Sequence, residues 1–525
     1  MRIRKCRRLE ASAFFYSGWD MLARALSLAV QGIDAYLVDI EVDIVKGLPG
    51  FTIVGLPDST IKESRERIRS AIENSGFGFP PHNFVVNLAP AGFKKQGSNF
   101  DLPVALAILQ ATGQISCDIT SIPAVGELSL DGGVKPVRGV IAMAICLYRS
   151  GHGRVIVPHD NSQEAAAVEG LDVFPVRSLA QAIEAHAGAC APFRAEKRNA
   201  LPHHHLYNFR DVRGQESAKR AIEIAAAGHH NILLYGPPGA GKTMLARRIP
   251  GILPPIGREE SIVTTMIHSV AGMLRPGEGL ICWPPFRAPH HTASDVALVG
   301  GGKVPSVGEV SLAHNGVLFL DELVEFKNNV LQALRQPLED CEITVARAGG
   351  SATFPADFML VASSNPCQCG FHFDPEIPCT CSPERVRGYF QKISGPILDR
   401  IDLEVLVARV KYGELLEPCD AEPSERIRER VARAREIQRR RQGNGTARFN
   451  ARMTNDEVKE HCVIDHETED LLENAIRRMC LSARSFFRIL KVSRTIADLE
   501  GAGSIAKRHL LEALSYKSLQ RNYEL

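Results

Sequence analysis

Hydrophobic positions along this chain recur with the spacing of strands and helices in turn. In Ala35–Val45, apolar residues alternate with acidic ones, which is typical of a strand with one buried face. Ile61–Asn74 has apolar positions at helical spacing, ends at Gly76, and has Ser59 as its expected N-cap. Other apolar runs fit strands at Gly50–Gly55, Phe84–Leu88, Ala124–Leu130 and Val155–Val157, and a buried helix at Leu102–Ala111. The alternation predicts an α/β fold, with folded sequence beginning near Met21.

A second α/β pattern follows, and then helices alone. Pro192–Leu206 mixes proline, charge and three adjacent histidines without an apolar period, which indicates a linker. Later segments fit helices at Glu216–Ala227, Pro423–Gln442, Thr454–Cys462, Glu467–Cys480, Ala483–Leu499 and Ile505–Tyr516. We therefore expect a disordered basic extension (1–20), a first domain (21–190), a linker (191–208), a second α/β domain (209–410) and a helical domain (411–525).

Composition excludes several classes of protein. The 525 residues are 45% hydrophobic and 23% charged, as in an ordinary soluble globular protein. A net charge of +2 means that any nucleic-acid contact must come from local patches. Thirteen cysteines without a secretory signal favour the cytoplasm over a disulfide framework. No run of 18 apolar residues predicts a membrane span. For the basic first twenty residues, a mitochondrial-type presequence is the alternative to a disordered extension.

A glycine-rich turn lies between an apolar run and a segment of helical spacing. Gly236, Gly241, Lys242 and Thr243 fit the pattern G-x-x-x-x-G-K-[ST] of a phosphate-binding P-loop. The complete turn is Gly236, Pro237, Pro238, Gly239, Ala240, Gly241, Lys242 and Thr243. Glycines let backbone N–H groups face phosphate oxygens, and the following helix offers its positive N-terminus. We expect Lys242 to reach the β- and γ-phosphates of ATP and the Thr243 hydroxyl to bind Mg²⁺.

Two carboxylates end a later buried strand. Gly316–Leu320 is apolar and runs directly into Asp321 and Glu322. After a P-loop, this order is the Walker B arrangement, in which the first carboxylate binds Mg²⁺ and the second orients the attacking water. A further buried strand, Phe358–Ser364, ends in Asn365.

Four cysteines form two close pairs. Cys367 and Cys369 are separated by nine residues from Cys379 and Cys381. Four thiolates on one loop suit tetrahedral Zn²⁺, although the spacing is C-x-C and not the commoner C-x₂-C. Unliganded or redox-active cysteines are the alternative, and His372 is a substitute ligand.

The first domain resembles the proteolytic domain of Lon-type proteases. The shared residues are Gly126–Leu128, Gly132–Val134, Pro136–Val137, Gly139 and Val155–Pro158. That chemistry needs a serine activated by a lysine amine. The lysine's position falls near Met143, in a segment without lysine, and the serine's near Ser98. The resemblance therefore implies a catalytically inactive Lon-like domain, as in RadA, with a role in assembly or DNA handling.

The order of these features resembles the ComM/YifB family of magnesium chelatase-like AAA+ ATPases. Its distinctive strings are Asp211–Lys219, Arg287–Thr292, Glu309–Glu322 and Ser394–Leu403. The resemblance runs from Met21 to about Tyr516 and implies an AAA+ core with chelatase-type insertions followed by a helical lid.

The resemblance also implies roles for single residues. Val212 and Gly214 would hold adenine, Asn365 would be sensor 1, and Arg400 an arginine finger acting on the neighbouring subunit. A plain salt-bridge role is the alternative for Arg400. Arg484 matches sensor 2, with Arg488 and Arg494 on the same predicted helix as alternatives.

Insertions of the chelatase type project into a central pore in related ATPases. They are Pro285–Thr292, Gly300–Lys303 and the predicted hairpin Glu342–Pro355, whose tip is Gly349-Gly350. Arg287, Lys303 and Arg347 are the candidate DNA contacts, and ordinary solvated basic residues are the alternative.

The family resemblance implies a ring-forming, hexameric DNA helicase without membrane contact. It would promote branch migration on single-stranded and branched DNA during natural transformation. A magnesium chelatase subunit and a protein-remodelling or scaffold ATPase are the alternatives from other functional classes.

Overall fold

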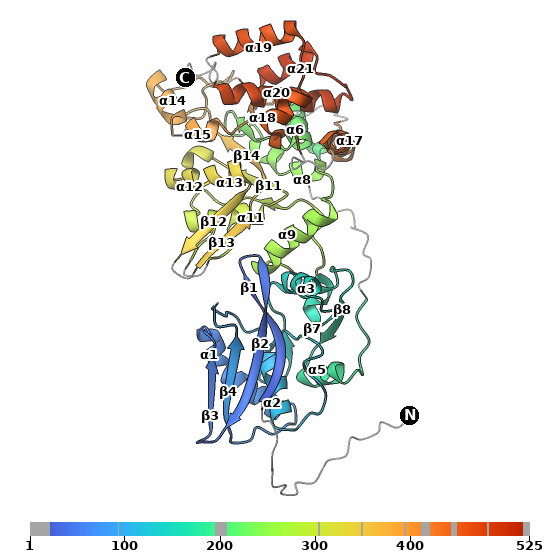
Figure 1. Ribbon diagram of the computed structural model, residues 1–525. Coiled ribbons are helices and arrows are strands. Elements are labelled where there is room, and N and C mark those ends of the chain that lie inside the picture. The colour runs from blue at the N-terminus through green and yellow to red at the C-terminus, as the bar shows by residue number, and fades with distance from the viewer. Residues whose placement is uncertain are drawn as a thin grey trace. The chain divides into compact units, whose positions relative to one another are not determined.

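A computed structural model describes residues 22–92, 94–194, 207–302, 305–347, 350–392, 395–410, 421–442, 449–479 and 482–517. Within them the chain forms two compact units (Figure 1). Unit 1 runs to residue 194, except for residues 31–33, and takes in Arg275–Glu278. Unit 2 comprises the rest of the described chain. Each unit is α/β, as the hydrophobic pattern predicts.

Unit 1 is built on a mixed sheet of order β1-β2-β4-β3. Its strands are β1 (Leu22–Gln31), β2 (Asp34–Val45), β3 (Gly50–Val54) and β4 (Asn83–Ala89). β4 pairs antiparallel with β2 and parallel with β3. Every second residue of β2 and β4 is buried, so one face of the sheet packs into the core with α1 (Ser59–Asn74) and α2 (Asp101–Ala111). The sequence pattern did not predict β1.

A second part of unit 1 follows α2 in the chain. Its elements are β5 (Glu127–Leu128), β6 (Val134–Lys135), α3 (Val140–Arg149), β7 (Arg154–Pro158), α4 (Ser162–Ala165), β8 (Asp172–Val176) and α5 (Leu179–His186). β7 and β8 pair in parallel, and β5 pairs with β6 across a tight turn.

Two local predictions in unit 1 were wrong. The N-cap of α1 is Asp58 and not Ser59, because the Asp58 carboxylate accepts the Ile61 backbone N–H at 2.9 Å. The strand expected over Ala124–Leu130 shrinks to β5, because Ala124 makes only an isolated bridge to Ile156. Apolar runs thus located the strands without determining how far their pairing extends.

Unit 2 contains a parallel sheet of order β10-β11-β14-β9-β15. The strands are β10 (Phe286–Arg287), β11 (Val317–Leu320), β14 (Met359–Ser364), β9 (Ile232–Tyr235) and β15 (Leu403–Leu406). All residues of β9, β11 and β14 are buried, as expected for strands with both faces covered. Parallel pairing brings their carboxyl ends to one edge, where the predicted polar residues follow each strand.

Helices and a hairpin surround this sheet. Before β11 lie α6 (Glu216–Gly228), α7 (Lys242–Ala246), α8 (Ile249–Ile252), α9 (Arg258–Val270), α10 (Asp295–Val299) and α11 (Glu309–Leu312); after it lie α12 (Asn328–Ala333), α13 (Arg335–Asp340), α14 (Pro383–Phe390) and α15 (Gly395–Leu398). β12 (Glu342–Arg347) and β13 (Gly350–Pro355) form the predicted antiparallel hairpin. Its predicted tip at residue 349 lies outside the described residues.

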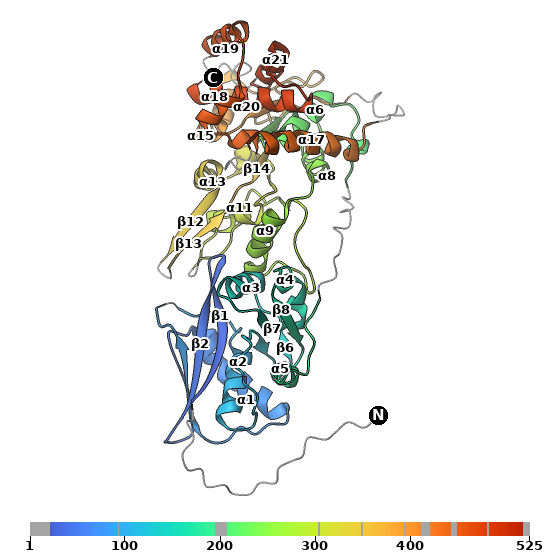
Figure 2. The same ribbon diagram turned by 45° about the vertical axis from the view of Figure 1, so that its right-hand side comes forward.

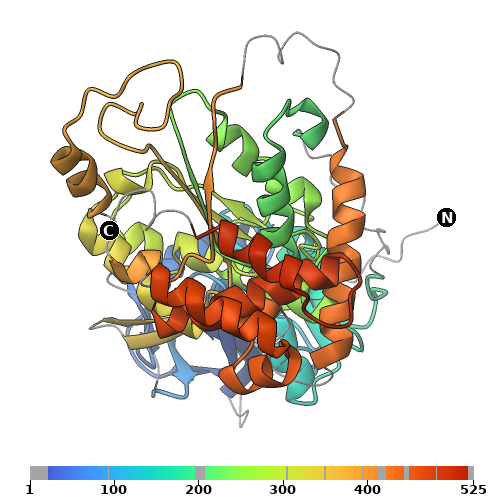
Figure 3. The ribbon, with the colours of Figure 1, turned by 90° about the horizontal axis from the view of Figure 1, so that it is seen from above.

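The predicted C-terminal helices all form. They are α17 (Ser424–Gln442), α18 (Asn455–His461), α19 (His466–Arg478), α20 (Ala483–Leu499) and α21 (Lys507–Ser515). α17 packs against α6 and α8, and α20 packs against α6, α17 and α21. Figures 2 and 3 show these orange and red helices gathered on one end of unit 2. Within the described chain, no helix is long and apolar enough to cross a membrane.

Candidate functional site

The P-loop connects the carboxyl end of β9 to α7. A Cβ at position 236 would lie 2.2 Å from the backbone oxygen of Val407, so only glycine fits there. Gly241 has a φ of +93° immediately before α7, a conformation that also favours glycine. The two motif glycines therefore allow the chain to turn sharply at both ends of the loop.

Lys242 is folded into the turn. Its Nζ donates hydrogen bonds to the backbone oxygens of Gly236 at 2.7 Å and Pro237 at 2.9 Å, and to Asn365 Oδ1 at 3.2 Å. Burial lowers the pKa of Lys242 to about 8, against the opposing effect of Asp321 and Glu322. The structure thus joins two residues predicted from separate motifs, since Lys242 and Asn365 are in contact.

Thr243 and Asp321 meet at the same edge. The Thr243 hydroxyl donates to Asp321 Oδ2 at 2.9 Å. Ser363 donates to the other oxygen of Asp321, and its own hydroxyl accepts the Glu322 backbone N–H at 3.1 Å. Ser363, which no sequence motif indicated, therefore connects β14 to the acidic end of β11. A hydroxyl and a carboxylate oxygen are the ligand types that Mg²⁺ prefers.

Glu322 adopts an unusual backbone conformation. Its φ of +55° lies in the left-handed region, which costs energy for a residue other than glycine. Its side chain is 54% exposed, and His291 Nδ1 lies 3.7 Å from its Oε2. His291 comes four residues after β10, which pairs in parallel beside β11. His291 belongs to the predicted insertion Pro285–Thr292, and no sequence pattern indicated this contact.

The segment predicted to hold adenine lies beside the P-loop. The Gln215 side chain donates to the backbone oxygen of Ala240 at 3.4 Å and to that of Ala408. Val212 is fully buried in the same hydrophobic core as Ala240, and Gly214 has a φ of +60°. These contacts place both predicted residues near the turn.

Comparisons with known proteins match this chain over most of its length. Family models of magnesium chelatase subunit ChlI match residues 40–161 and 208–415, and that of its C-terminal region matches 421–517. YifB of Salmonella typhimurium is 42% identical over 504 residues, which is 95% of this chain and 98% of that protein. Competence protein ComM of Haemophilus influenzae is 43% identical over 509 residues, with the same coverage. The chain belongs to the ComM/YifB family of magnesium chelatase-like proteins. Lon protease 2 of Bacillus subtilis is 28% identical over 127 residues, 24% of this chain and 23% of that protein.

In this ComM/YifB family member, Arg400 lies at the other edge of the unit 2 sheet. The Asn231 side chain donates to the Arg400 backbone oxygen at 2.8 Å, and Asn231 immediately precedes β9. The P-loop instead follows the carboxyl end of β9. The Arg400 side chain is 6% exposed and pairs with Glu339. Its pKa is lowered by burial, against Glu339, with Arg484 and Arg488 adding repulsion.

The sensor 2 candidates differ in their surroundings. Arg484 is 63% exposed and lies 3.6 Å from Glu339, beside Arg400. Arg488 pairs with Asp402 at 3.2 Å. Arg494 is buried in α20, where it donates to Asp498 at 3.1 Å and to backbone oxygens at Ala502 and Gly503. Arg484 alone of these three described arginines presents a mostly exposed guanidinium.

Of the three candidate DNA contacts, only Arg287 has a side chain among the described residues. Arg287 forms a two-point ion pair with Glu309 at 2.6 and 2.7 Å, which ties β10 to α11. Its role in DNA binding stays a prediction. Lys303 and the Arg347 side chain lie outside the described residues.

The cysteine pairs converge on one place. Cys367, Cys369, Cys379 and Cys381 place their sulfur atoms within 4.8 Å of one another, so the cluster could hold a metal ion. His372 is not a member of this group; its ring packs on Phe373.

The position of the Lon-type serine has acidic surroundings in unit 1. The Ser98 hydroxyl donates to the Glu127 carboxylate. Met143, at the expected position of the lysine, is buried in an apolar cluster. The nearby Lys95 directs its amine to the Pro90 backbone oxygen.

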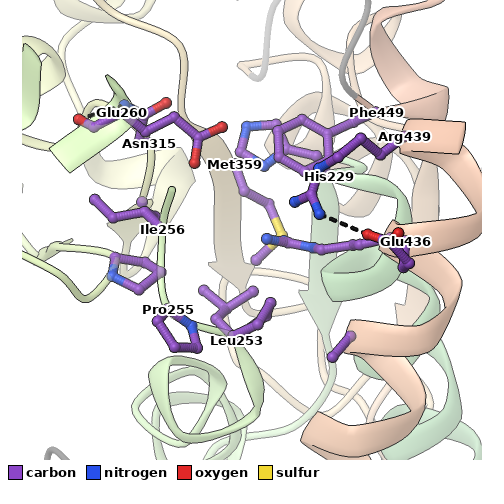
Figure 4. Close-up of a pocket in the computed structure, with 15 residues that line it drawn as sticks. His229, Leu253, Pro255, Ile256, Glu260, Asn315, Met359, Glu436, Arg439 and Phe449 are labelled. Atoms are coloured by element: carbon purple, nitrogen blue, oxygen red, sulfur yellow. Dashed lines mark hydrogen bonds and ion pairs between the residues drawn. The ribbon is translucent and has the colours of Figure 1, made fainter. Parts of the chain in front are cut away.

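A cavity of about 300 Å³ lies elsewhere in unit 2 (Figure 4). His229, Gly316 and Met359, which line it, lie at the amino ends of β9, β11 and β14. The Arg435 side chain stacks 4.7 Å from the Phe449 ring and donates to the Ala226 backbone oxygen at 2.7 Å. The cavity therefore lies at the edge opposite the P-loop and is separate from it.

Proposed function

We propose that this protein is an ATP hydrolase of the AAA+ class. Four polar groups at the carboxyl edge of one parallel sheet support the proposal. Lys242 donates to Asn365 at 3.2 Å, and Thr243 donates to Asp321 at 2.9 Å. Backbone N–H groups of the P-loop and Lys242 would bind the phosphates, Thr243 and Asp321 the Mg²⁺ ion, and Glu322 the attacking water. Membership in a magnesium chelatase-like family supports the same conclusion.

We propose that the protein forms a ring in which each nucleotide is bound between two subunits. The family resemblance implies six subunits. Arg400 and Arg484 lie together at the edge opposite their own P-loop, so they are placed to serve a neighbour's phosphates. Arginine supplied from another subunit stabilises the charge of phosphoryl transfer. Arg484 and Arg488 repel the charge of Arg400, and this cluster of positive charge favours binding of an anionic phosphate. Arg484 is the more exposed of Arg400 and Arg484, so it would need the smaller movement to reach a neighbour's phosphate.

We propose that the ATPase acts on DNA and works in the cytoplasm. The support is 43% identity to a protein named competence protein ComM, together with the resemblance to branch-migration ATPases. The β12–β13 hairpin corresponds to an insertion that projects into the central pore in related ATPases. Branch migration of single-stranded and branched DNA during natural transformation is the activity that this family role implies.

A branch-migration assay on a synthetic three- or four-way junction tests the proposal. Wild type should move the junction with ATP and Mg²⁺, and single-stranded DNA should stimulate its ATPase. Lys242→Ala and Glu322→Gln should both fail to move it. ATP hydrolysis that DNA does not change would favour a protein-remodelling ATPase, and normal migration by Lys242→Ala would refute the mechanism.

A magnesium chelatase role is the second candidate, because the matching family models describe subunit ChlI of that enzyme. It predicts ATP-dependent insertion of Mg²⁺ into a porphyrin when the other chelatase subunits are added. Copurification with such subunits would favour it over the DNA motor.

A further inference from the structure

The cysteine cluster has the dimensions of a tetrahedral metal site. Cys367 Sγ lies 3.3 Å from Cys369 Sγ and 3.7 Å from Cys379 Sγ, and Cys369 Sγ lies 3.5 Å from Cys379 Sγ. A zinc–sulfur bond of about 2.3 Å in a tetrahedron separates the sulfurs by roughly 3.8 Å. A disulfide would need about 2.05 Å, and all of these cysteines are free. The sulfur–sulfur distances are therefore close to the edge length of a ZnS₄ tetrahedron and far from the length of a disulfide bond.

Backbone N–H groups surround these sulfurs. The amide of His372 is hydrogen-bonded to Cys367, and those of Phe371 and Thr380 to Cys369. Amide donors to sulfur support thiolate ligands and orient them toward a metal. The loop thus supplies both the ligands and their supporting hydrogen bonds.

The cluster is built directly onto the nucleotide site. Cys367 is fully buried and lies two residues after Asn365, whose amide oxygen contacts Lys242. Gly370 packs so closely on the P-loop that a Cβ there would lie 2.8 Å from Pro238 Cδ. Phe373 sets its ring edge-on to Tyr235, the last residue of β9, with centroids 6.2 Å apart.

We propose that Cys367, Cys369, Cys379 and Cys381 bind one Zn²⁺, and that this ion holds the Cys367–Phe373 segment against the P-loop. Zinc would then be required for nucleotide affinity, since the segment positions Asn365 and supports Pro238. Binding replaces four S–H protons by four Zn–S bonds and releases four protons, without oxidation or reduction. The coupling rests on the proposed nucleotide site, whereas the metal site does not.

Metal content tests the first part. Protein purified under reducing conditions and never exposed to chelator should contain one zinc per chain by elemental analysis. The double variant Cys379→Ser/Cys381→Ser should lose it, and Cys282→Ser, a free cysteine elsewhere in unit 2, should keep it. Co²⁺ in place of zinc should show thiolate charge-transfer and tetrahedral d–d absorption. Absence of stoichiometric zinc in wild type, or equal zinc in the double variant, would overturn the metal site.

Reversible removal of zinc tests the coupling in one folded protein. Chelator under reducing conditions should weaken binding of a fluorescent ATP analogue by about tenfold or more, as expected when a binding group is misplaced by about 1 Å. Added Zn²⁺ should restore the affinity while the circular dichroism spectrum stays unchanged. Affinity that does not follow zinc would overturn the coupling.

Gly370→Ala tests the contact without touching a ligand. Its Cβ would press on Pro238, at a backbone φ of +88° that favours glycine. The variant should keep one zinc and bind the ATP analogue more weakly, whereas Gly388→Ala, at a site with open space, should match wild type. Unchanged affinity in Gly370→Ala would overturn the coupling. Zinc-loaded wild type that binds no ATP would instead refute the proposed function and leave the metal site standing.

Discussion

The Thr243 hydroxyl donates to Asp321 Oδ2 at 2.9 Å across 78 positions of sequence. This hydrogen bond joins the P-loop, which follows β9, to the acidic end of β11, at the edge of the sheet where β9 and β11 both end. A hydroxyl and a carboxylate, both of ligand types that suit Mg²⁺, are thereby in contact. The contact brings together two motifs that are far apart in the chain.

Lys242→Ala should strongly weaken nucleotide binding. The amine is the one positive side chain of the predicted motif that reaches into the turn, and its loss removes a charged hydrogen bond to phosphate. We expect ATP affinity to fall by about 100-fold, or roughly 3 kcal/mol, in a fluorescence titration. Lys507→Ala, on an exposed residue of α21 paired with Glu467, should bind as wild type does.

Nucleotide affinity should fall as the pH rises through about 8. Burial lowers the pKa of Lys242 to about 8, so the amine is protonated below that pH and neutral above it. Phosphate binds the protonated form, and each pH unit above 8 should cost up to about tenfold in affinity. Titrations from pH 7 to 9.5 measure this slope. Lys242→Arg should bind with a flat profile because guanidinium stays charged; a flat wild-type profile would contradict the assignment.

Glu322→Gln should separate binding from hydrolysis. The amide keeps the shape of the side chain but cannot accept a proton from water, so turnover should fall by about 10²- to 10⁴-fold. ATP affinity should stay near that of wild type, measured by the same titration. Glu325→Gln, on a neighbouring exposed residue, serves as control and should hydrolyse ATP normally.

Arg484→Ala should be inactive alone and rescued by mixing. If Arg484 serves the neighbour's phosphates, subunits lacking Arg484 and subunits carrying Glu322→Gln together form some complete sites. Mixed rings should therefore hydrolyse more ATP than either variant alone. Arg478→Ala, exposed at the end of α19, should behave as wild type. Activity in the mixture that never exceeds that of the separate variants would exclude a shared site.

Arg452→Met should destabilise unit 2. Arg452 donates to Asp357 Oδ1 at 2.9 and 2.6 Å. Burial alone would raise the pKa of Asp357, but Arg452 and His229 outweigh it and hold that pKa well below its usual range. The pair is partly buried, with side chains 17% and 25% exposed, so removing one partner should lower the free energy of unfolding by up to about 3 kcal/mol in urea at pH 7.

The same ion pair gives a direction for the pH dependence. A carboxylate with a depressed pKa contributes stability above its unfolded pKa near 4, and that stability is lost as the pH falls below it. Wild type should therefore lose its advantage over Arg452→Met progressively as the pH falls below about 4. Arg478→Met should show the wild-type profile, and an advantage that does not shrink below pH 4 would contradict the pair's role.

Much of the candidate nucleotide site could be predicted from local patterns. Gly236–Thr243 is predicted as a P-loop because its glycines and lysine are close in sequence. The position of Asp321 and Glu322 at the end of a buried strand could be predicted because the residues before them are all apolar. The C-terminal helices from Asn455 onward followed from apolar spacing, which depends on each helix separately.

Tertiary structure alone decided which groups meet. Ser363 bonds Asp321 because β14 pairs in register beside β11, and His291 lies near Glu322 because β10 pairs on the other side. The same parallel order places Arg400 at the amino edge, opposite its own P-loop. It also packs Gly370 on Pro238 and gives Arg287 the partner Glu309. Sequence by itself determined the motifs, since those rest on neighbouring residues. Strand order and register, which rest on long-range packing, determined their partners.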